Sequence, residues 1–358
     1  MPSTCPSGYD QVVTLKAKNT KLRIIKIIGN DLRDEDGIWR TGTSGFWSML
    51  PKTDMAAYLD DLESMQPEDI AEKHFPNLKD LIFSPQRPGG LSILDIKPDD
   101  IVIDAGCMWG ALTIPLARTG ARVVGLDQTE ESLKFLNARA KSENLDNVSL
   151  VQTDLNTVDL KPESINLLVL NGVMEWLGEG DIEAASLWAG ETQNENARRG
   201  NPGDIQQAFL NKVHSALKPD GQLYLAIENR YDAANYFGAR DPHTGQRGVT
   251  VLPRSLQNFF SKLFTKRPYR AWIHGEAGLR KMLKQAGYRD ITVRYAFPDY
   301  RYPELVLTKD GMKRFRPVRY LKAAAFPTKL FWYGLETIFY KILRWASLAP
   351  SFIIVAKK

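Results

Sequence analysis

The chain has 358 residues, of which 43% are hydrophobic and 25% charged, the composition of an ordinary globular enzyme. Its two cysteines, Cys5 and Cys107, supply neither a disulfide framework nor a metal-ligand cluster. The net charge of +5 is modest, but Lys and Arg crowd the last hundred residues, where an anionic partner could bind. The first twenty residues lack the pattern of a signal peptide, so a cytoplasmic location is expected.

Residues 101–127 read as an apolar run, an acid, a glycine-containing bend, a helical pattern, a second apolar run and a second acid. This order is typical of a β-α-β unit that binds a nucleotide-like ligand at the bend. Gly106 and Gly110 can adopt backbone angles closed to other residues and let a ligand approach the main chain. Asp127 stands where doubly wound folds place an acid that binds ribose hydroxyls. The alternative is a tight turn without a ligand.

Three more apolar runs, at residues 148–151, 165–170 and 222–227, are expected to be strands. Polar residues follow each of them: Asp154 the first, Asn171 and Glu175 the second, and Glu228 the third. The carboxyl ends of parallel strands meet at one edge of a sheet, so these side chains should face one crevice. Residues 178–203 are polar and aperiodic, which indicates a surface insertion that is either a lid or a plain loop.

The succession DAGCMWG, GLDQ, QTDL, NGVMEWL, LKPDG and IEN resembles class I S-adenosylmethionine-dependent methyltransferases over residues 87–297. The resemblance implies an α/β fold with a Rossmann-like, doubly wound, seven-stranded and mostly parallel sheet. Its last strand, at residues 352–356, would lie antiparallel between the fifth and the sixth. The implied domains are an N-terminal extension or cap at 1–95, a methyltransferase core at 96–297 with insertions at 178–203 and 230–272, a basic aromatic helical insertion at 298–350 and a closing strand at 351–358.

The resemblance also implies S-adenosylmethionine as the cofactor. The two glycines would support the amino-acid part of the cofactor. The acid at the end of the second strand would bind its ribose, and the acid after the third strand would lie near its adenine. The residues that would hold it are Asp104, Gly106, Gly110, Asp127, Asp154 and Asn171. Met108 departs from the family, because the bend commonly has a glycine there. A dinucleotide oxidoreductase is less expected, since a pyrophosphate needs a closer glycine cluster.

The segments SPQRPGGL, IENRYDAANYFGARDPHTG and FPDYRYP resemble bacterial methyltransferases of surface-polysaccharide synthesis, which implies a sugar acceptor. Aromatic residues such as Tyr231 could stack on a sugar face, and Asn229, Arg230 and Asp241 could bind its hydroxyls. The alternative is that many of these residues simply belong to the core.

Methyl transfer to a hydroxyl needs an in-line approach and, usually, a base that takes the hydroxyl proton. His243 is the favoured base because histidine accepts a proton near neutral pH, and Glu175 and Glu228 are the alternatives. The histidine could instead only support its turn. No metal is expected, since His74, His214 and His274 form no ligand cluster in the sequence.

Residues 311–348 interleave Arg and Lys with Phe, Tyr, Trp and Leu. This pattern suits a helix at the surface of an anionic membrane, although a cap helix that packs on the sheet or on a second subunit is favoured. The stretch is too short and too charged to span a bilayer. Nucleic acid is not expected as a partner, because no recognised binding module accompanies the basic residues.

The expected function is transfer of a methyl group to a sugar hydroxyl in a surface glycan or its lipid-linked precursor. One alternative is an enzyme that methylates a small lipid or quinone-type metabolite. The other is a non-catalytic, cofactor-binding scaffold for glycosyltransferases, which are possible partners in either case.

Overall fold

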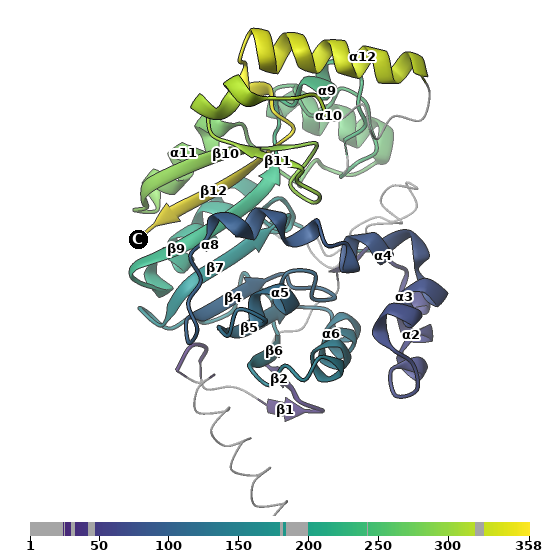
Figure 1. Cartoon of the computed structure of the whole chain (residues 1–358), viewed down its shortest axis with the longest axis vertical. Helices are drawn as coiled ribbons and strands as arrows, with labels where there is room; N and C mark the ends of the chain where they lie inside the picture. The colour runs from purple at the N-terminus through teal and green to yellow at the C-terminus, as the bar shows by residue number, and fades with distance from the viewer. Residues whose placement is uncertain are drawn as a thin grey trace, which may run out of the picture.

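A ten-stranded sheet runs through the molecule from β1 at one end to β11 at the other (Figure 1). The computed structural model describes residues 24, 26–29, 33–41, 47–179, 182–183, 200–241, 243–318 and 326–358. In spatial order the strands are β1 Arg33–Glu35, β2 Ile38–Arg40, β6 Val148–Gln152, β5 Arg122–Asp127, β4 Ile101–Ala105, β7 Ile165–Asn171, β9 Leu217–Glu228, β12 Ser351–Lys357, β10 Arg289–Phe297 and β11 Leu305–Leu307.

The middle of this sheet confirms the predicted Rossmann-like arrangement. Strands β6, β5, β4, β7 and β9 are parallel neighbours, and β12 lies antiparallel between β9 and β10. The sheet is larger than the seven strands expected. β2 adds parallel to β6, β1 pairs antiparallel with β2, and β11 pairs antiparallel with β10. These three additions have only three residues each, too few for a periodic pattern in the sequence.

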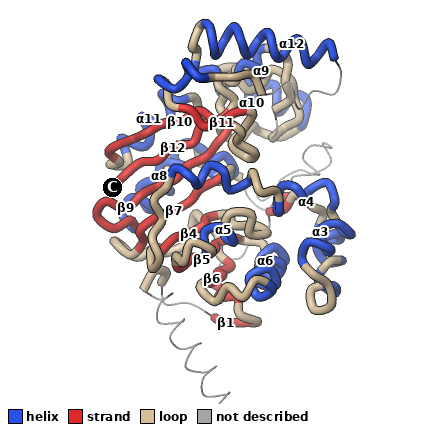
Figure 2. The backbone as a smooth tube through the Cα atoms, viewed as in Figure 1, coloured by secondary structure: helices blue, strands red, loops and turns tan. Residues whose placement is uncertain are grey.

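The central strands are apolar throughout because both faces of the sheet are buried. Along β4, Ile103 packs into the core on one face and Val102 into the core on the other. Along β7, Leu168 and Leu167 divide in the same way. Helices cover the two faces, as Figure 2 shows in blue against the red strands. They include α5 Thr113–Ala117, α6 Glu130–Ser142, α8 Pro202–Ala216 and α11 Glu276–Gln285.

A small N-terminal helical group packs against the bend after β4. It consists of α2 Lys52–Ala57, α3 Pro67–His74 and α4 Pro76–Phe83, with 3-10 turns at Leu59–Asp61 and Arg87–Ile93. Trp109 of the bend is buried in this group, where its ring stacks on Phe75 at 5.5 Å between ring centres. Tyr58 and Phe135 complete the cluster. The N-terminal helical group therefore packs against the bend on the side away from the strands. Its helices belong to the extension that the sequence predicts at 1–95.

The late helices lie beyond the β11 end of the sheet (Figure 1). They are α9 Ala233–Tyr236, α10 Arg254–Thr265 and α12 Phe326–Glu336, which continues into a π-helical turn at Thr337–Ile342. Short 3-10 turns occupy Met174–Trp176, Asp310–Arg314 and Ala346–Leu348. Among the described residues, no helix is long and apolar enough to cross a membrane.

Most of the predicted insertion at 178–203 falls outside the described residues. Its described part includes β8 Ile182–Glu183, which pairs in parallel with β3 Trp47–Ser48 in a separate two-stranded sheet. The predicted choice between a lid and a plain loop stays a prediction, and so do the domain boundaries.

Candidate functional site

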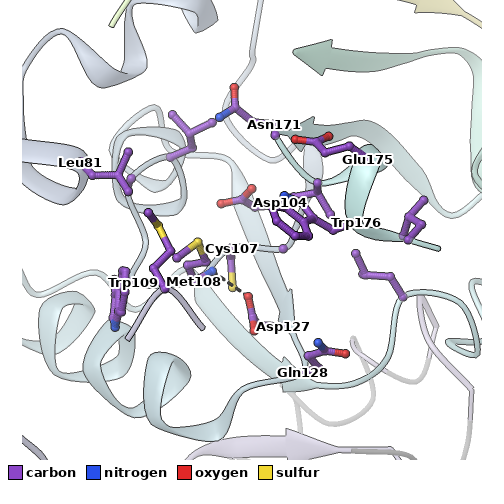
Figure 3. Close-up of a pocket in the computed structure, with 18 of the residues that line it drawn as sticks. Leu81, Asp104, Cys107, Met108, Trp109, Asp127, Gln128, Asn171, Glu175 and Trp176 are labelled. Atoms are coloured by element: carbon purple, nitrogen blue, oxygen red, sulfur yellow. Dashed lines mark hydrogen bonds between the residues drawn. The ribbon is translucent and has the colours of Figure 1, made fainter. Parts of the chain in front are cut away.

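A cavity of about 200 Å³ opens at the carboxyl edge of the parallel strands (Figure 3). Its walls come from the ends of β4, β5, β7 and β9, from the residues that follow β6 and β7, from the N-terminal helical group, and from the loops at 243 and 300–301. The predicted crevice is therefore a single space, and residues far apart in the chain share it.

The bend after β4 is held by its glycines and by Asp127. Gly106 has φ +75°, and an added Cβ would lie 2.5 Å from the Val173 side chain. Gly110 has φ +82°, and a Cβ there would overlap the side chain of Leu136. Both positions therefore need glycine for local geometry and packing, independently of any ligand. Gly106 lines the cavity, whereas Gly110 lies outside the lining.

Met108 adopts the conformation that glycine usually takes, with φ +44°. Its backbone N–H donates to Oδ2 of Asp127 at 2.9 Å. The backbone at Met108 is thus in the left-handed region, which glycine adopts without strain. Only the side chain of this residue departs from the family pattern. This departure leaves the bend intact and in contact with the acid predicted to bind ribose.

The two aspartates at the ends of β4 and β5 are buried in the cavity wall. Burial raises the pKa of Asp127 to about 6, although N–H groups of Thr129 and Met108 counteract the shift. Burial also raises the pKa of Asp104 to about 6. The hydrogen bond that its carboxylate accepts from the Thr113 hydroxyl at 2.6 Å lowers this pKa, but by less than burial raises it. Both carboxylates are thus ionised at neutral pH and carry oxygens into the cavity.

Asp154 and Asn171 extend the same wall along the strand ends. Asp154 follows β6 and accepts a hydrogen bond from the backbone N–H of Asn156 at 2.9 Å. Asn171 is the last residue of β7. Both line the cavity. Five of the six residues predicted to hold the cofactor therefore line the same cavity. They lie at the carboxyl ends of the neighbouring strands β6, β5, β4 and β7.

The three residues predicted as bases meet at the other part of the cavity. Glu175 lies in the turn after β7, Glu228 ends β9, and His243 lies on the loop after α9. One ligand atom from each lies within 4.8 Å of the others. All three line the cavity that also contains the cofactor candidates.

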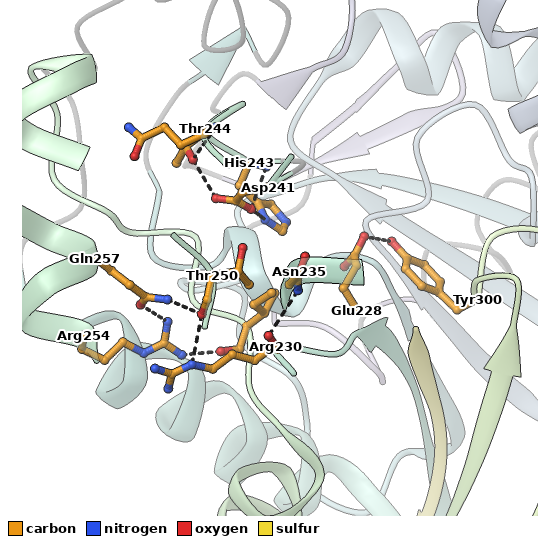
Figure 4. Close-up of polar contacts among 12 residues, drawn as sticks. Glu228, Arg230, Asn235, Asp241, His243, Thr244, Thr250, Arg254, Gln257 and Tyr300 are labelled. Carbon is orange, nitrogen blue, oxygen red and sulfur yellow. Dashed lines mark hydrogen bonds and ion pairs between the residues drawn. The ribbon is translucent and has the colours of Figure 1, made fainter. Parts of the chain in front are cut away.

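His243 is fixed by Asp241 (Figure 4). Its Nδ1 lies 3.0 Å from Oδ1 of Asp241, whose Oδ2 accepts from the Thr244 hydroxyl at 2.7 Å. The indole of Trp176 packs edge-on against the imidazole at 4.9 Å between ring centres. Burial alone would lower the pKa of His243, but Asp241 and the two glutamates outweigh it and raise this pKa to about 9.

The glutamates form a close carboxyl pair. Glu175 is 1% exposed, and burial followed by the charge of Glu228 raises its pKa well above the ordinary range. Glu228 accepts a hydrogen bond from the Tyr300 hydroxyl at 3.2 Å (Figure 4). The group therefore combines proton donors and acceptors in a region largely withdrawn from water.

The four residues predicted to bind substrate lie outside the cavity lining. Asn229 is buried and donates to the carbonyls of Ser347 and Ala349, both at 2.7 Å. Arg230 donates to the carbonyls of residues 250 and 252. Tyr231 is 38% exposed, and Asp241 contacts His243 instead of the cavity. In this structure they shape the loops around the site.

The lining residues that were not singled out from the sequence include Arg87, Tyr300 and Arg301. Tyr300 and Arg301 belong to the segment FPDYRYP and Arg87 to SPQRPGGL, so the resemblance to polysaccharide methyltransferases was the available signal. The backbone carbonyl of Arg301 accepts from Nη1 of Arg87 at 3.4 Å, which joins the two segments. The polar character of the cavity thus comes partly from regions beyond the strand ends.

The donor set of Glu175, Glu228 and His243 could hold a divalent cation, because carboxylate oxygen and imidazole nitrogen are common metal ligands. Within the described residues, His74, His214 and His274 belong to no group of three such ligand atoms. Cys107, buried beside the bend, has a pKa raised well above its ordinary value by burial and then by Asp127 and Asp104. Its thiol is therefore protonated and unsuited to nucleophilic chemistry.

Comparison with known proteins matches a family described as a methyltransferase domain to residues 96–245. A 23S rRNA (uracil(1939)-C(5))-methyltransferase of Shewanella sediminis is 36% identical over 88 residues, which cover 25% of this chain and 17% of that protein. A carboxy-S-adenosyl-L-methionine synthase of Klebsiella pneumoniae is 23% identical over 50% of this chain and 59% of its own. The chain thus matches less than two thirds of the length of either relative.

A solved S-adenosylmethionine dependent methyltransferase of Listeria monocytogenes is similar with a TM-score of 0.45 and 16% identity, over 75% of this chain and 95% of its own. The family match thus supports a methyltransferase domain at residues 96–245, with S-adenosylmethionine as its cofactor.

Proposed function

Starting from a methyltransferase domain that uses S-adenosylmethionine, we propose that this chain transfers the methyl group to a hydroxyl of a sugar, in a surface glycan or its lipid-linked precursor. The observation that carries the proposal is the convergence of His243, Glu175 and Glu228 in the cavity that the cofactor candidates border. A hydroxyl acceptor needs such groups, because it must lose its proton as its oxygen attacks the sulfonium methyl.

The division of the cavity supports this reaction. Asp104 and Asp127 lie at the ends of β4 and β5, and Asp154 follows β6, while Glu228 ends β9 and His243 lies on the loop after α9. A cofactor bound along the three acids would place its methyl toward the residues that follow β7 and β9. An acceptor oxygen between that methyl and the His243–Glu175–Glu228 group would then have an attack path. The pKa of His243 is raised to about 9, so this imidazole is protonated at neutral pH, and Glu228 is the proton acceptor in this proposal.

A sugar suits the character of the acceptor part. Arg87, Tyr300 and Arg301 offer hydrogen-bond donors, Glu175 and Glu228 offer carboxylate oxygens, and Trp176 offers an aromatic surface. Several hydroxyls need donors and acceptors at once, and a sugar ring also has an apolar face that packs on aromatic groups. The resemblance of the segments around these residues to methyltransferases of surface-polysaccharide synthesis supports the same class of acceptor.

Methylation of a small lipid or quinone-type metabolite is the second candidate. The apolar share of the cavity wall favours it, since Met49, Leu81 and Leu112 also line the space. A non-catalytic scaffold that organises glycosyltransferases is the third. The converged His243 group weighs against the scaffold, because a buried carboxyl pair is costly to maintain without a use.

The test uses the full chain with S-adenosylmethionine carrying a labelled methyl group. Calorimetric titration with S-adenosylmethionine and S-adenosylhomocysteine comes first, and binding of both is expected. The protein is then incubated with glycan, lipid and small-metabolite fractions, and label is expected in the glycan or lipid-linked glycan fraction. Label in a quinone fraction alone would replace the sugar proposal. Cofactor binding without label in any fraction would favour the scaffold.

A peripheral membrane contact through residues 311–348 belongs to the same proposal, and α10 strengthens it. Helix α10 buries the polar residues Gln257 and Ser261, whereas Phe259 is 59% and Phe264 69% exposed. The described part of 311–348 likewise exposes apolar side chains. They include Leu330, Phe331, Tyr333, Ile338, Ile342, Leu343 and Trp345. Exposed aromatic residues with basic neighbours are typical of helices that lie at an anionic lipid surface.

Charge favours a lipid surface as the occupant. Residues 254–270 contain five basic residues and no acid. In α12 and the turn that follows it, the one acid, Glu336, is buried, while Lys329 and Lys341 are exposed. Sedimentation with vesicles measures this contact: binding is expected with vesicles that contain phosphatidylglycerol and not with phosphatidylcholine alone. Replacing Phe259 and Phe264 by Ser should reduce it, and equal binding to both vesicle types would contradict the proposal.

A further inference from the structure

The carboxyl pair of Glu175 and Glu228 lacks the partners that buried carboxylates normally have. Oε2 of each residue is buried, and within the described part of the chain neither atom has a hydrogen-bond partner. Glu175 is 99% buried, since only 1% of it is exposed. Two adjacent carboxyl groups buried in this way cannot both stay ionised without a positive charge between them, so the pair holds either a shared proton or a bound cation.

The imidazole of His243 lies beside the two carboxyl groups and could be a third ligand. Asp241 holds Nδ1 of His243, which leaves Nε2 as the free ring nitrogen, and the imidazole ligand atom lies within 4.8 Å of the two carboxylate ligand atoms. A histidine fixed by a carboxylate on its other nitrogen is the usual support of a metal ligand in proteins. Tyr300 holds Oε1 of Glu228 in a comparable way.

From this arrangement we propose that Glu175, Glu228 and His243 bind one divalent cation, whose remaining positions take hydroxyl oxygens of the acceptor. The proposal rests on the methyl-transfer function above and adds to it a metal that no comparison assigns. In this role the three side chains are ligands, and Asp241 and Tyr300 are positioning residues.

The geometry is compatible with a transition-metal ion. Bond lengths of ~2.0–2.2 Å place neighbouring ligands of one ion about 3–3.6 Å apart and opposite ligands about 4.4 Å apart. The three ligand atoms lie within 4.8 Å of one another, so side-chain shifts of about an ångström would close them around an ion. Two carboxylates and one imidazole suit Mn²⁺, Fe²⁺ or Zn²⁺ better than Mg²⁺, which prefers oxygen ligands and water. Three protein ligands leave open positions, as catalytic sites require and structural zinc sites do not.

The chemistry of the acceptor fits the open positions. Neighbouring hydroxyls of a sugar can bind one ion through two oxygens, which fixes the ring and directs one oxygen toward the methyl group. The ion also lowers the pKa of a hydroxyl that it binds, so that the proton leaves to water before the oxygen attacks. Orientation and activation would then come from the same site.

The experiment uses the full-length protein after removal of metals with a chelator, and the probe is Mn²⁺ alone. Electron paramagnetic resonance measures free Mn²⁺ during titration, and one ion per chain is expected to bind. Glu175→Gln and His243→Gln should each weaken binding at least ~10-fold, and Asp241→Asn should weaken it ~10–100-fold. His74→Ala is the matched control, because His74 contacts a carboxylate of Asp61 outside the cavity and its loss should leave Mn²⁺ binding unchanged.

The outcomes separate this proposal from the function on which it rests. If the chain does not bind Mn²⁺, or if Glu175→Gln binds Mn²⁺ as the unmodified protein does, the cation site is wrong. Methyl transfer that continues at full rate in chelator leads to the same conclusion and leaves the acceptor proposal intact. If instead Mn²⁺ binds at these residues but no glycan is labelled, the sugar acceptor is wrong and the cation site stands. Circular dichroism of each variant shows whether it is folded.

Discussion

The two parts of the cavity are built in different ways. The cofactor part comes from consecutive strand ends between residues 104 and 171, and each acid or amide there follows the strand that positions it. The acceptor part joins the turn at Glu175 to Glu228 and to loops at 243 and 300–301. Under the proposed function, consecutive strand ends of the sheet would hold the cofactor, and the later loops would contact the acceptor.

The sharpest test of this division is His243→Ala. It should lower turnover by ~10²-fold or more, because either the positive charge beside Glu175 and Glu228 or a metal ligand is lost, and leave the affinity for S-adenosylmethionine unchanged. Single-turnover transfer of labelled methyl and calorimetric titration measure the two quantities. A variant that loses cofactor affinity as well would show that the two parts of the cavity are not independent.

The converse test is Asp127→Ala. A hydrogen bond to a charged group contributes ~1.5–3 kcal/mol, so cofactor binding should weaken by about 10- to 150-fold. The substitution also removes the acceptor of the Met108 and Thr129 N–H groups, so Asp127→Asn is the control that keeps side-chain volume. If affinity is unchanged in both variants, the ribose site lies elsewhere.

Asn229→Ala separates a loop support from a substrate ligand. The Asn229 amide donates to the Ser347 and Ala349 carbonyls, and its loss should lower the free energy of unfolding by ~1–3 kcal/mol. Thermal denaturation measures this change. The KM for the acceptor should stay within about 3-fold of the original, a change no larger than that of an ordinary distant substitution. A large rise in KM at unchanged stability would support direct contact with substrate.

The pH dependence of cofactor affinity should come mainly from the cofactor part. The pKa of Asp127 is raised to about 6, so this carboxylate is ionised at pH 7 and gains a proton as the pH falls below 6. Ribose hydroxyls donate better to the ionised form, so affinity should be constant above pH 7 and fall by up to ~10-fold at pH 5. Asp127→Asn should reduce this fall, and the part that remains would report Asp104, whose pKa is also raised to about 6. A cofactor affinity that falls as the pH rises above 7 would contradict this prediction.

The smallest effect is expected for Met108→Gly. The backbone N–H of residue 108 still donates to Asp127, and glycine adopts the positive φ without strain. Cofactor affinity should therefore change by no more than ~0.5 kcal/mol, the range of substitutions that remove no specific contact. A marked gain in affinity would mean that the methionine side chain obstructs the ligand.

The amino-acid sequence by itself determined the β-α-β unit, the buried central strands and a set of residues at the strand ends, five of which border one cavity. It could do so because buried parallel strands are continuously apolar and Asp104, Asp127 and Asn171 end theirs, so local order along the chain predicts position in space. The short edge strands β1, β2 and β11 had no periodic signal, since three residues are too few for one.

Only the tertiary structure decided how the acceptor part is assembled. From the sequence, His243, Glu175 and Glu228 were alternatives for one role, whereas the fold brings all three within 4.8 Å as one group. It also directs Asn229 and Arg230 toward backbone carbonyls and brings Arg87 and Tyr300 to the cavity wall. The physical reason is that these residues are far apart in the sequence. How they meet depends on the way the loops pack on the sheet, and no local sequence pattern encodes that packing. The residues concerned are 87, 175, 228, 243 and 300.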